Sequence, residues 1–458
     1  MRKEIDLYKS DAISIIDEDK LGRTSFINVV ADFINSQATE VNKDGKIEYR
    51  NLKDPLTIGI YGKWGYGKTS IIRCVENKLK HSFYTAQFNP WMYNNEDDLV
   101  KHLFETLVAS ISGTSDARKR KKLVKGIAKY LLHFTKGIKA DIKLGGFLSH
   151  IQTTLGVNLQ SISEAALKDI DKKETVYHVK EQINDVLRSL ANPIVVFIDD
   201  IDRLSKSEVY MLFKTVRLIA DFKNIIYVLS FDDEMVAKSI KDNFAGGSDY
   251  DGFHYIEKII DVPLRVPQID GHLMDNYFRE KLGISSNVLI TNFHRQLNII
   301  THYLFDCPRD CIRVANSVNL MKSFLKDNID YEDLILIESI RLKAPHLFYY
   351  LTRYYNDIIV NNDPLYYGNT YNVPKQLELK LGVGGITNRA ISMWQFFFRH
   401  LLRVDIINSL KIEILDDNGR ILKVEEFDQN STLLNDGSNR LYNPKVLEQY
   451  LKTTLFLD

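Results

Sequence analysis

The stretch TIGIYGKWGYGKTSIIR, residues 57–73, decides the fold class expected for this chain. It runs from an apolar, β-rich segment through a glycine-spaced loop to an apolar restart at Ile71 and Ile72, which predicts a strand, a loop and a helix. The loop from Gly62 to Thr69 has the spacing GxxxxGK[ST]. Glycines let the N–H groups of such a loop turn inward around phosphate oxygens, at the positive end of the following helix. The stretch therefore predicts a phosphate-binding loop.

The chemistry of the loop residues suggests a role for each of them. Lys68 is expected to reach the terminal phosphates of a nucleotide, and the Thr69 hydroxyl is expected to ligate Mg²⁺. A chance match in a glycine-rich turn is the alternative, so the rest of the chain has to supply the second half of a site. The residues expected to contact the nucleotide are Gly62, Gly65, Tyr66, Gly67, Lys68, Thr69 and Ser70.

The segment PIVVFIDDIDRL, residues 193–204, supplies that second half. Its apolar, β-branched run from Ile194 to Ile198 is typical of a parallel strand buried on both faces. The run ends in Asp199, Asp200 and Asp202. Three carboxylates there are costly unless a positive group lies beside them, and in a phosphate-binding α/β fold that group is Mg²⁺ with its waters. An acidic helix cap is the alternative, and it explains one Asp better than three.

The acidic residues divide into three expected roles. Asp199 is expected to hold the metal together with Thr69. Asp200 is the candidate to orient or deprotonate the attacking water, as a catalytic residue beside Lys68. Asp202 and Arg203 are expected to pair locally or to face a neighbouring subunit.

Three further apolar stretches complete the expected sheet, at residues 83–91, 224–234 and 261–266. Strands that alternate with helices predict a doubly wound parallel sheet, with the nucleotide at the carboxyl ends of the strands. At the strand end in the middle stretch, Ser230 or Asp232 could sense the γ-phosphate, and a helix N-cap by Asp232 or Asp233 is the alternative. We therefore expect an α/β fold.

The composition excludes few classes of partner. The chain has 458 residues, which is enough for two or three domains, and its 60 basic and 60 acidic residues cancel. Whole-chain charge therefore favours no partner. Three cysteines are too few for a disulfide framework, and Cys307 with Cys311 lacks a second Cys/His pair to form a metal site.

The compartment is inferred from what the sequence lacks. The start MRKEIDLYKSDA has no apolar core of a signal peptide. No apolar stretch reaches the roughly 18 to 20 residues that a membrane span needs. We expect a cytoplasmic protein.

Several motifs together resemble the KAP family of P-loop NTPases. They are GIYGKWGYGKTS, QFNPWMY, VVFIDDIDRL, FDDEMV, GFHYIEKIIDVPLRVP and CPRDCIRVANSV, in this order, and DAISIIDEDKLGR precedes them. The likeness covers residues 10–325, and its specific pieces are FNPW and DDIDR. It implies an ATPase that uses ATP and Mg²⁺ and is related to oligomeric AAA+ and signalling NTPases. Family members are mostly bacterial and are often linked to phage exclusion.

The resemblance also implies roles for basic residues. In related NTPases a basic residue before the last core strand reaches the neighbouring subunit's site, and Lys258 occupies the comparable place; Arg203 and Arg217 are rivals for this catalytic role. A second sensor would come from the helical lid, where Arg309 or Arg313 could meet the phosphates. For each of these residues, an ordinary surface salt bridge is the alternative.

One stretch departs from the family pattern. Many members insert transmembrane helices between the two phosphate motifs, whereas residues 111–175 of this chain contain the basic sequence RKRKKLVKGIAKYLLHFTKGIKADIK at 118–143. Its apolar residues recur at helical spacing, as at Leu123 and Ile127. Such a helix could rest on a membrane surface, touch nucleic acid or pack on a partner protein. Packing on its own domain is the alternative.

These patterns predict three regions. Residues 1–270 form a P-loop NTPase core with the α-helical insert, residues 271–330 form a helical lid, and residues 331–458 form a mixed α+β region of unknown role. Within the last region, DNG between two alternating runs predicts a β-hairpin at residues 412–427.

The expected function is that of an ATP-hydrolysing, homo-oligomeric molecular switch. Its setting in bacterial anti-phage defence follows from the family resemblance alone. A nucleotide-dependent scaffold that recruits a separate effector protein with little hydrolysis is one alternative. A DNA-associated ATPase is another, for which stimulation by DNA and a steep salt dependence would be the sign.

Overall fold

The computed structural model divides the chain into two compact units, residues 12–268 and residues 1–11 with 269–458, and each unit is described by itself. The later part of the predicted insert, residues 136–174, lies outside the described residues. The structure describes residues 11–41, 47–93, 96–111, 117–135, 175–241, 249–284, 300–302, 304–325, 328–343, 377–382, 409–415, 421–428 and 444–455, with Tyr8, Leu297, Pro345 and Phe348.

A five-stranded sheet forms the centre of the 12–268 unit, and all its neighbouring strands are parallel. The order across the sheet is β4-β5-β6-β3-β7. β6 therefore separates the strand of the phosphate-binding loop, β3, from the strand of the acidic run, β5. The strands span β3 (Leu56–Tyr61), β4 (Tyr84–Phe88), β5 (Ile194–Ile198), β6 (Ile225–Phe231) and β7 (Val262–Arg265).

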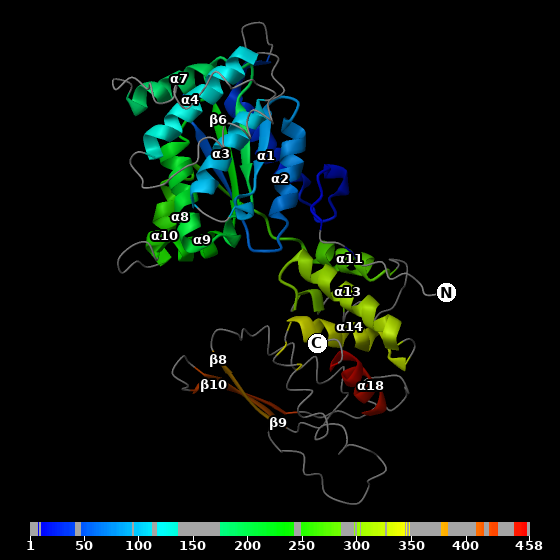
Figure 1. Cartoon of the computed structure of the whole chain (residues 1–458). Helices are drawn as coiled ribbons and strands as arrows, with labels where there is room; N and C mark the ends of the chain where they lie inside the picture. Colours follow the sequence, from blue (N-terminus) through cyan, green and yellow to red (C-terminus); the bar gives the residue numbers. More distant parts are fainter. Residues whose placement is uncertain are drawn as a thin grey trace, which may run out of the picture. The chain divides into compact units, whose positions relative to one another are not determined.

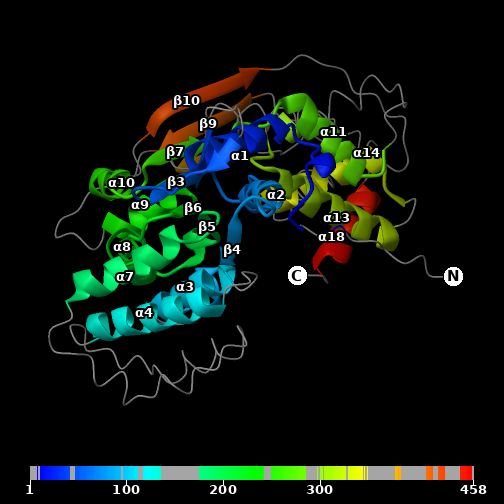
Figure 2. The same cartoon turned by 90° about the horizontal axis from the view of Figure 1, so that it is seen from above.

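Helices cover both faces of this sheet, which confirms the predicted doubly wound α/β fold (Figure 1). One face carries α1 (Thr24–Ala38) and α2 (Lys68–Leu79). The other face carries α3 (Glu96–Ser110), α4 (Ala117–Thr135), α7 (Val176–Arg188), α8 (Lys206–Lys214), α9 (Asp233–Lys241) and α10 (Asp249–Glu257). Figure 2 shows the two layers from above, with the strands between them.

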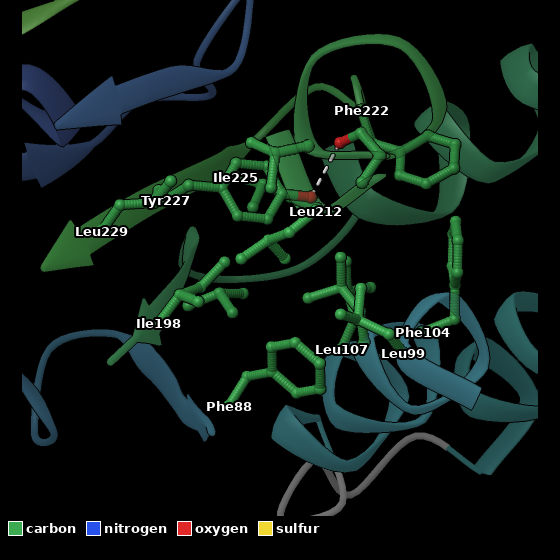
Figure 3. Packing of buried hydrophobic residues seen from close by; sticks show 14 of the residues in the cluster. Phe88, Leu99, Phe104, Leu107, Ile198, Leu212, Phe222, Ile225, Tyr227 and Leu229 are labelled. Atoms are coloured by element: carbon green, nitrogen blue, oxygen red, sulfur yellow. Dashed lines mark hydrogen bonds between the residues drawn. The ribbon is translucent and has the colours of Figure 1, made fainter. Parts of the chain in front are cut away.

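Alternation along the strands divides the core into these two layers. In β5, Ile194, Val196 and Ile198 face the α3 layer, whereas Val195 and Phe197 face α1 and α2. Every residue of β5 and β6 is buried, as the continuous apolar runs of both strands predict. Figure 3 shows the layer on the α3 side of the sheet, in which side chains of β5 and β6 meet those of α3.

The basic helix α4 belongs to this core. Its apolar residues Leu123, Val124, Ile127 and Tyr130 are buried in the α3 layer, and α4 packs against α7. Among its residues 118–130, whose burial the structure describes, the exposed ones are all basic, namely Arg118, Lys121, Lys122 and Lys125. Within the described residues, no helix has both the length and the apolar character that a membrane crossing requires.

The second unit begins with helices where the sequence predicts a lid. It contains α11 (Gly271–Lys281), α13 (Pro308–Leu325), α14 (Tyr331–Lys343) and α18 (Pro444–Leu455), and α13 packs against the other three. The carboxylate of Glu338 is buried between these helices. It accepts hydrogen bonds from the Tyr450 hydroxyl at 2.6 Å and from Arg341 at 2.9 Å.

Small sheets complete the described structure. In the second unit, β9 (Ser409–Leu415) and β10 (Ile421–Asp428) are antiparallel with Leu415 opposite Ile421, as expected for the predicted hairpin. β8 (Leu377–Gly382) pairs in parallel with β9, and we had predicted no strand there. In the first unit, β1 (Thr39–Val41) pairs with β2 (Ile47–Tyr49).

Candidate functional site

The phosphate-binding loop leaves β3 and enters α2 through glycines in an unusual backbone conformation. Gly65 and Gly67 both have φ of 84°, in the left-handed region that a side chain disfavours. At Gly62 an added Cβ would lie 3.4 Å from Val266 of the strand-end segment beside it. The Gly62 amide donates to the carbonyl of Phe231 at 3.2 Å, which ties the loop to the end of β6.

Lys68 lies inside this loop. Its side chain is buried, and its ammonium donates to the carbonyl of Gly62 at 2.8 Å and to that of Lys63 at 3.4 Å. The same nitrogen lies 3.5 Å from a carboxylate oxygen of Asp202. This contact joins the two motifs that the sequence analysis treated as halves of one site, across 134 residues of chain.

Asp199 ends β5 with its carboxylate beside β6. It accepts a hydrogen bond from the hydroxyl of the buried Ser230, and its own amide donates to the carbonyl of Phe88 at 3.2 Å. The alternative role for Asp232 is the one seen here, because its carboxylate accepts from the amide of Met235 at 3.2 Å and caps α9.

Asp200 has a strained backbone and a well-held side chain. Its φ of 59° lies in the left-handed region, which is uncommon for a residue other than glycine. One carboxylate oxygen lies 2.7 Å from Arg203 Nη2, and the other accepts from the Asn89 amide at 3.1 Å. Burial, and then the charge of Asp199, raise the pKa of Asp200 above its usual value, although Arg203 and Asn89 oppose them.

Arg203 lies over the rings of two tryptophans. Its guanidinium carbon is 6.0 Å from the ring centroid of Trp64, in the loop, and 5.2 Å from that of Trp91. Both indoles are more than half exposed, at 57% and 56%. Asn89 and Trp91 belong to the FNPW motif, so this motif was the available signal for contacts that our sequence analysis did not predict.

The other loop residues lie where the spacing predicts. Tyr66 is half-buried in the loop, and Thr69 and Ser70 are half-buried in the first turn of α2. Beside Tyr66 lies a residue that we did not predict, the buried Arg23, which donates to the carbonyl of Pro267. Burial lowers the pKa of Arg23, with the charges of Asp19 and Tyr66 opposing it.

Two of the remaining basic candidates, Lys258 and Arg217, lie outside this cluster. Lys258 is exposed in the turn between α10 and β7, and it makes no hydrogen bond or ion pair with the part of the chain that is described. Arg217 is exposed in the π-helical turn η4 (Thr215–Ile219) after α8. Arg309 and Arg313 lie on α13 of the second unit, whose position relative to the loop is not defined.

The donor and acceptor set fits a nucleotide with Mg²⁺. The left-handed glycines and the start of α2 present N–H groups, and Lys68 supplies a cation whose partners among the described residues are two backbone carbonyls and one carboxylate. Thr69 and Asp199 offer the oxygen ligands that Mg²⁺ prefers. The arrangement is therefore chemically suited to bind and cleave a phosphoanhydride.

Comparison with known proteins gives one family. The KAP family P-loop domain matches residues 22–337. The Phage T7 exclusion protein of Escherichia coli (strain K12) is 24% identical over 329 residues, which cover 66% of this chain and 43% of that protein. The chain thus spans less than half the length of this relative.

Solved structures with a similar fold share little sequence with this chain. A Thermotoga maritima RuvB mutant is 12% identical, with a TM-score of 0.34 over 72% of this chain and 73% of that one. The Aeropyrum pernix ORC1 protein in complex with DNA is 10% identical, with a TM-score of 0.35 over 75% of this chain and 69% of that one.

Proposed function

The chain belongs to the KAP family of P-loop NTPases, and we propose that it binds and hydrolyses ATP as an oligomeric molecular switch. The observation that carries the proposal is the position of Lys68. Its ammonium lies between the carbonyls of the glycine loop and the carboxylate of Asp202, where the two phosphate motifs meet. A buried ammonium whose nearest carboxylate oxygen is 3.5 Å away is suited to exchange its present contacts for hydrogen bonds to phosphate oxygens.

Each residue of the site has a role in this proposal. The loop N–H groups and Lys68 bind the phosphates, and Thr69 and Asp199 hold Mg²⁺, which neutralises phosphate charge. Asp200 orients the attacking water and accepts its proton. Lys258 is exposed just before β7 and is proposed to reach the site of a neighbouring copy.

We place this switch in bacterial anti-phage defence. The support is the similarity to a phage exclusion protein, which extends over two thirds of the present chain. The same relative is more than twice as long as the matched region, so the similarity concerns only part of it. Protection of a bacterial host against phage infection, lost with Lys68→Ala, is the expected outcome in a plaque assay.

The test of the biochemical function is phosphate release from ATP by the purified protein with Mg²⁺. We expect turnover in the wild-type protein and none above background in Lys68→Ala. Lys53→Ala removes an exposed lysine before β3 and serves as the matched control, with unchanged turnover. Equal rates in the wild-type protein and Lys68→Ala would overturn the proposal.

Two observations favour other functions. If the ion pair between Arg203 and Asp200 keeps this carboxylate from the attacking water, the opposite of the positioning role argued below, the protein would be a scaffold that binds ATP and turns it over slowly while an effector protein is recruited. The exposed basic face of α4 suits an ATPase that associates with DNA. ATP-dependent assembly without turnover would favour the scaffold, and DNA stimulation that falls steeply with salt would favour the DNA-associated enzyme.

A further inference from the structure

The guanidinium of Arg203 lies where three segments that are distant along the chain meet. Trp64 comes from the glycine loop, Trp91 from the short helix η2 (Pro90–Met92) after β4, and Arg203 itself from the turn η3 (Ile201–Arg203) after β5. The two indoles lie 6.0 and 5.2 Å from the guanidinium carbon. Cation–π contacts over the faces of a guanidinium leave its edge free to donate hydrogen bonds.

That edge is directed at Asp200. Arg203 Nη2 lies 2.7 Å from one carboxylate oxygen, and the Asn89 amide donates to the other at 3.1 Å. Asn89 is also the cap of η2, because its side-chain oxygen accepts from the amide of Trp91 at 3.1 Å. The segment from Asn89 to Trp91 therefore contacts Arg203 through Trp91 and Asp200 through Asn89.

Arg203 and Asp200 are each restrained by contacts outside their ion pair. A surface Arg–Asp pair three residues apart usually has little effect, because both side chains sample several rotamers. Here the arginine contacts two tryptophan rings, and the aspartate is restrained by its left-handed backbone and a second hydrogen bond. Confinement of both partners is what fixes the direction of the carboxylate.

We propose that Arg203 is a positioning residue for the site of its own chain, where Trp64 and Trp91 hold it so that it aims the Asp200 carboxylate at the attacking water. Because Trp64 is part of the phosphate-binding loop, the aim of Asp200 depends on the state of that loop. This inference rests on the proposed function, and it replaces the expectation that Arg203 reaches a neighbour's site.

Tryptophan fluorescence tests the stacked arrangement without any turnover. The chain has three tryptophans, so Trp394→Phe leaves only the two indoles beside Arg203. In that background we expect Arg203→Gln to shift the emission and to raise the acrylamide quenching constant about twofold, since the guanidinium no longer shields the rings. An unchanged emission and quenching constant would overturn the stacked arrangement and with it the proposal.

Single-turnover kinetics tests the positioning role. Arg203→Gln is expected to lower the rate of hydrolysis at least tenfold, while the affinity for a non-hydrolysable ATP analogue changes less than threefold. Trp64→Leu should lower the rate as well, and the double variant should be no slower than Arg203→Gln alone, because both act through one contact. Arg203→Lys should restore only part of the rate, since an ammonium lacks the planar edge.

The matched control is Arg188→Gln on α7. Arg188 also pairs with an aspartate three residues away, Asp185, at 2.8 Å, and neither of the two described tryptophans lies against it. We expect neither the rate nor the affinity to change in this variant. A loss equal to that of Arg203→Gln would show that general destabilisation causes the effect, and the proposal would then be wrong.

Mixed assemblies separate a role in the same chain from a role in a neighbour. A Lys68→Ala chain has a dead site but an intact Arg203, so mixing it with an Arg203→Gln chain would restore hydrolysis if Arg203 acted on the neighbour. We expect no recovery, and recovery would overturn the proposal. Absence of turnover in the wild-type protein would overturn the proposed hydrolysis, whereas turnover that survives Arg203→Gln would overturn the positioning role alone.

Discussion

At the scale of single residues, two substitutions at Asp200 distinguish the role of its charge from that of its left-handed backbone. Asparagine tolerates the left-handed region in which Asp200 lies, whereas alanine is disfavoured there by about 1–2 kcal/mol. We therefore predict that Asp200→Asn abolishes hydrolysis with little change in the midpoint of thermal unfolding. Asp200→Ala should also abolish hydrolysis and should lower the free energy of unfolding by about 1 kcal/mol more.

Calorimetry and single-turnover hydrolysis on the two variants check this prediction. Nucleotide affinity is the internal control, because Lys68 and the glycine loop are intact in both variants. Residual turnover above one tenth of the wild-type rate in Asp200→Asn would show that another group accepts the proton. Equal unfolding midpoints in the two variants would show that the backbone at this position is not strained.

Spacing alone predicted the residues of the site that are close in sequence. The loop glycines, Lys68 and the acidic run follow from two motifs, and the structure places Lys68 beside Asp202. The contact of Arg203 with Trp64 and Trp91 could not be predicted in this way. These three residues meet because they follow β4, β5 and β3, whose carboxyl ends lie at the same edge of one sheet. The order of strands in a sheet cannot be predicted from a local sequence pattern.

At the scale of elements, the close approach of α9 and α10 makes a glycine necessary. A Cβ on Gly252 of α10 would lie 2.1 Å from the carbonyl oxygen of Ala237 in α9, where backbone cannot yield easily. We predict that Gly252→Ala lowers the free energy of unfolding by about 3 kcal/mol, at the upper end of the usual cost of overpacking. The measurement is urea unfolding followed by circular dichroism.

Gly126→Ala in α4 is the matched control for this change. Its added Cβ would lie 2.9 Å from Cγ1 of Ile183, a side-chain atom rather than backbone, and alanine is about 0.5–1 kcal/mol more favourable than glycine inside a helix. We expect the two terms nearly to cancel, so that stability changes by less than about 1 kcal/mol. Equal losses in the two variants would contradict the interpretation that backbone contact sets the cost.

The start of α8 offers a second prediction at this scale. The Ser205 hydroxyl accepts from the Glu208 amide at 3.4 Å, and the Glu208 carboxylate accepts from the Ser205 amide at 2.9 Å, which forms a capping box. Ser205→Ala removes one half of it and should lower the free energy of unfolding by about 1 kcal/mol. Ser205→Asp retains a capping acceptor and should recover most of that loss in the same unfolding assay.

Apolar runs predicted the core strands well, and they predicted helix ends less well. β5 spans the five residues expected for it, because both of its faces are buried and every position must be apolar. The helix between β5 and β6 changes after Lys214 into the π-helical turn η4. Hydrogen-bond spacing within a helix is not visible in apolar periodicity, so this change could not be predicted from the pattern.

At the scale of the whole molecule, the question is which copy of the chain uses the basic residue that precedes β7. Lys258 lies there, exposed, without a hydrogen bond or ion pair to the described part of the chain. We predict that hydrolysis per chain rises with protein concentration, because a neighbouring copy has to bring Lys258 to the site. Lys258→Ala should remove this rise while it leaves nucleotide affinity unchanged.

Phosphate release measured over a hundredfold range of protein concentration, beside the mass of the protein in solution with a non-hydrolysable ATP analogue, decides this prediction. Lys80→Ala, which removes an exposed lysine at the end of α2, is the control and should keep the concentration dependence. Assembly should survive Lys258→Ala, since one exposed lysine contributes little to an interface but much to charge in a transition state. A rate per chain that is constant from the lowest concentration, in a protein that stays a monomer, would show that one chain completes its own site.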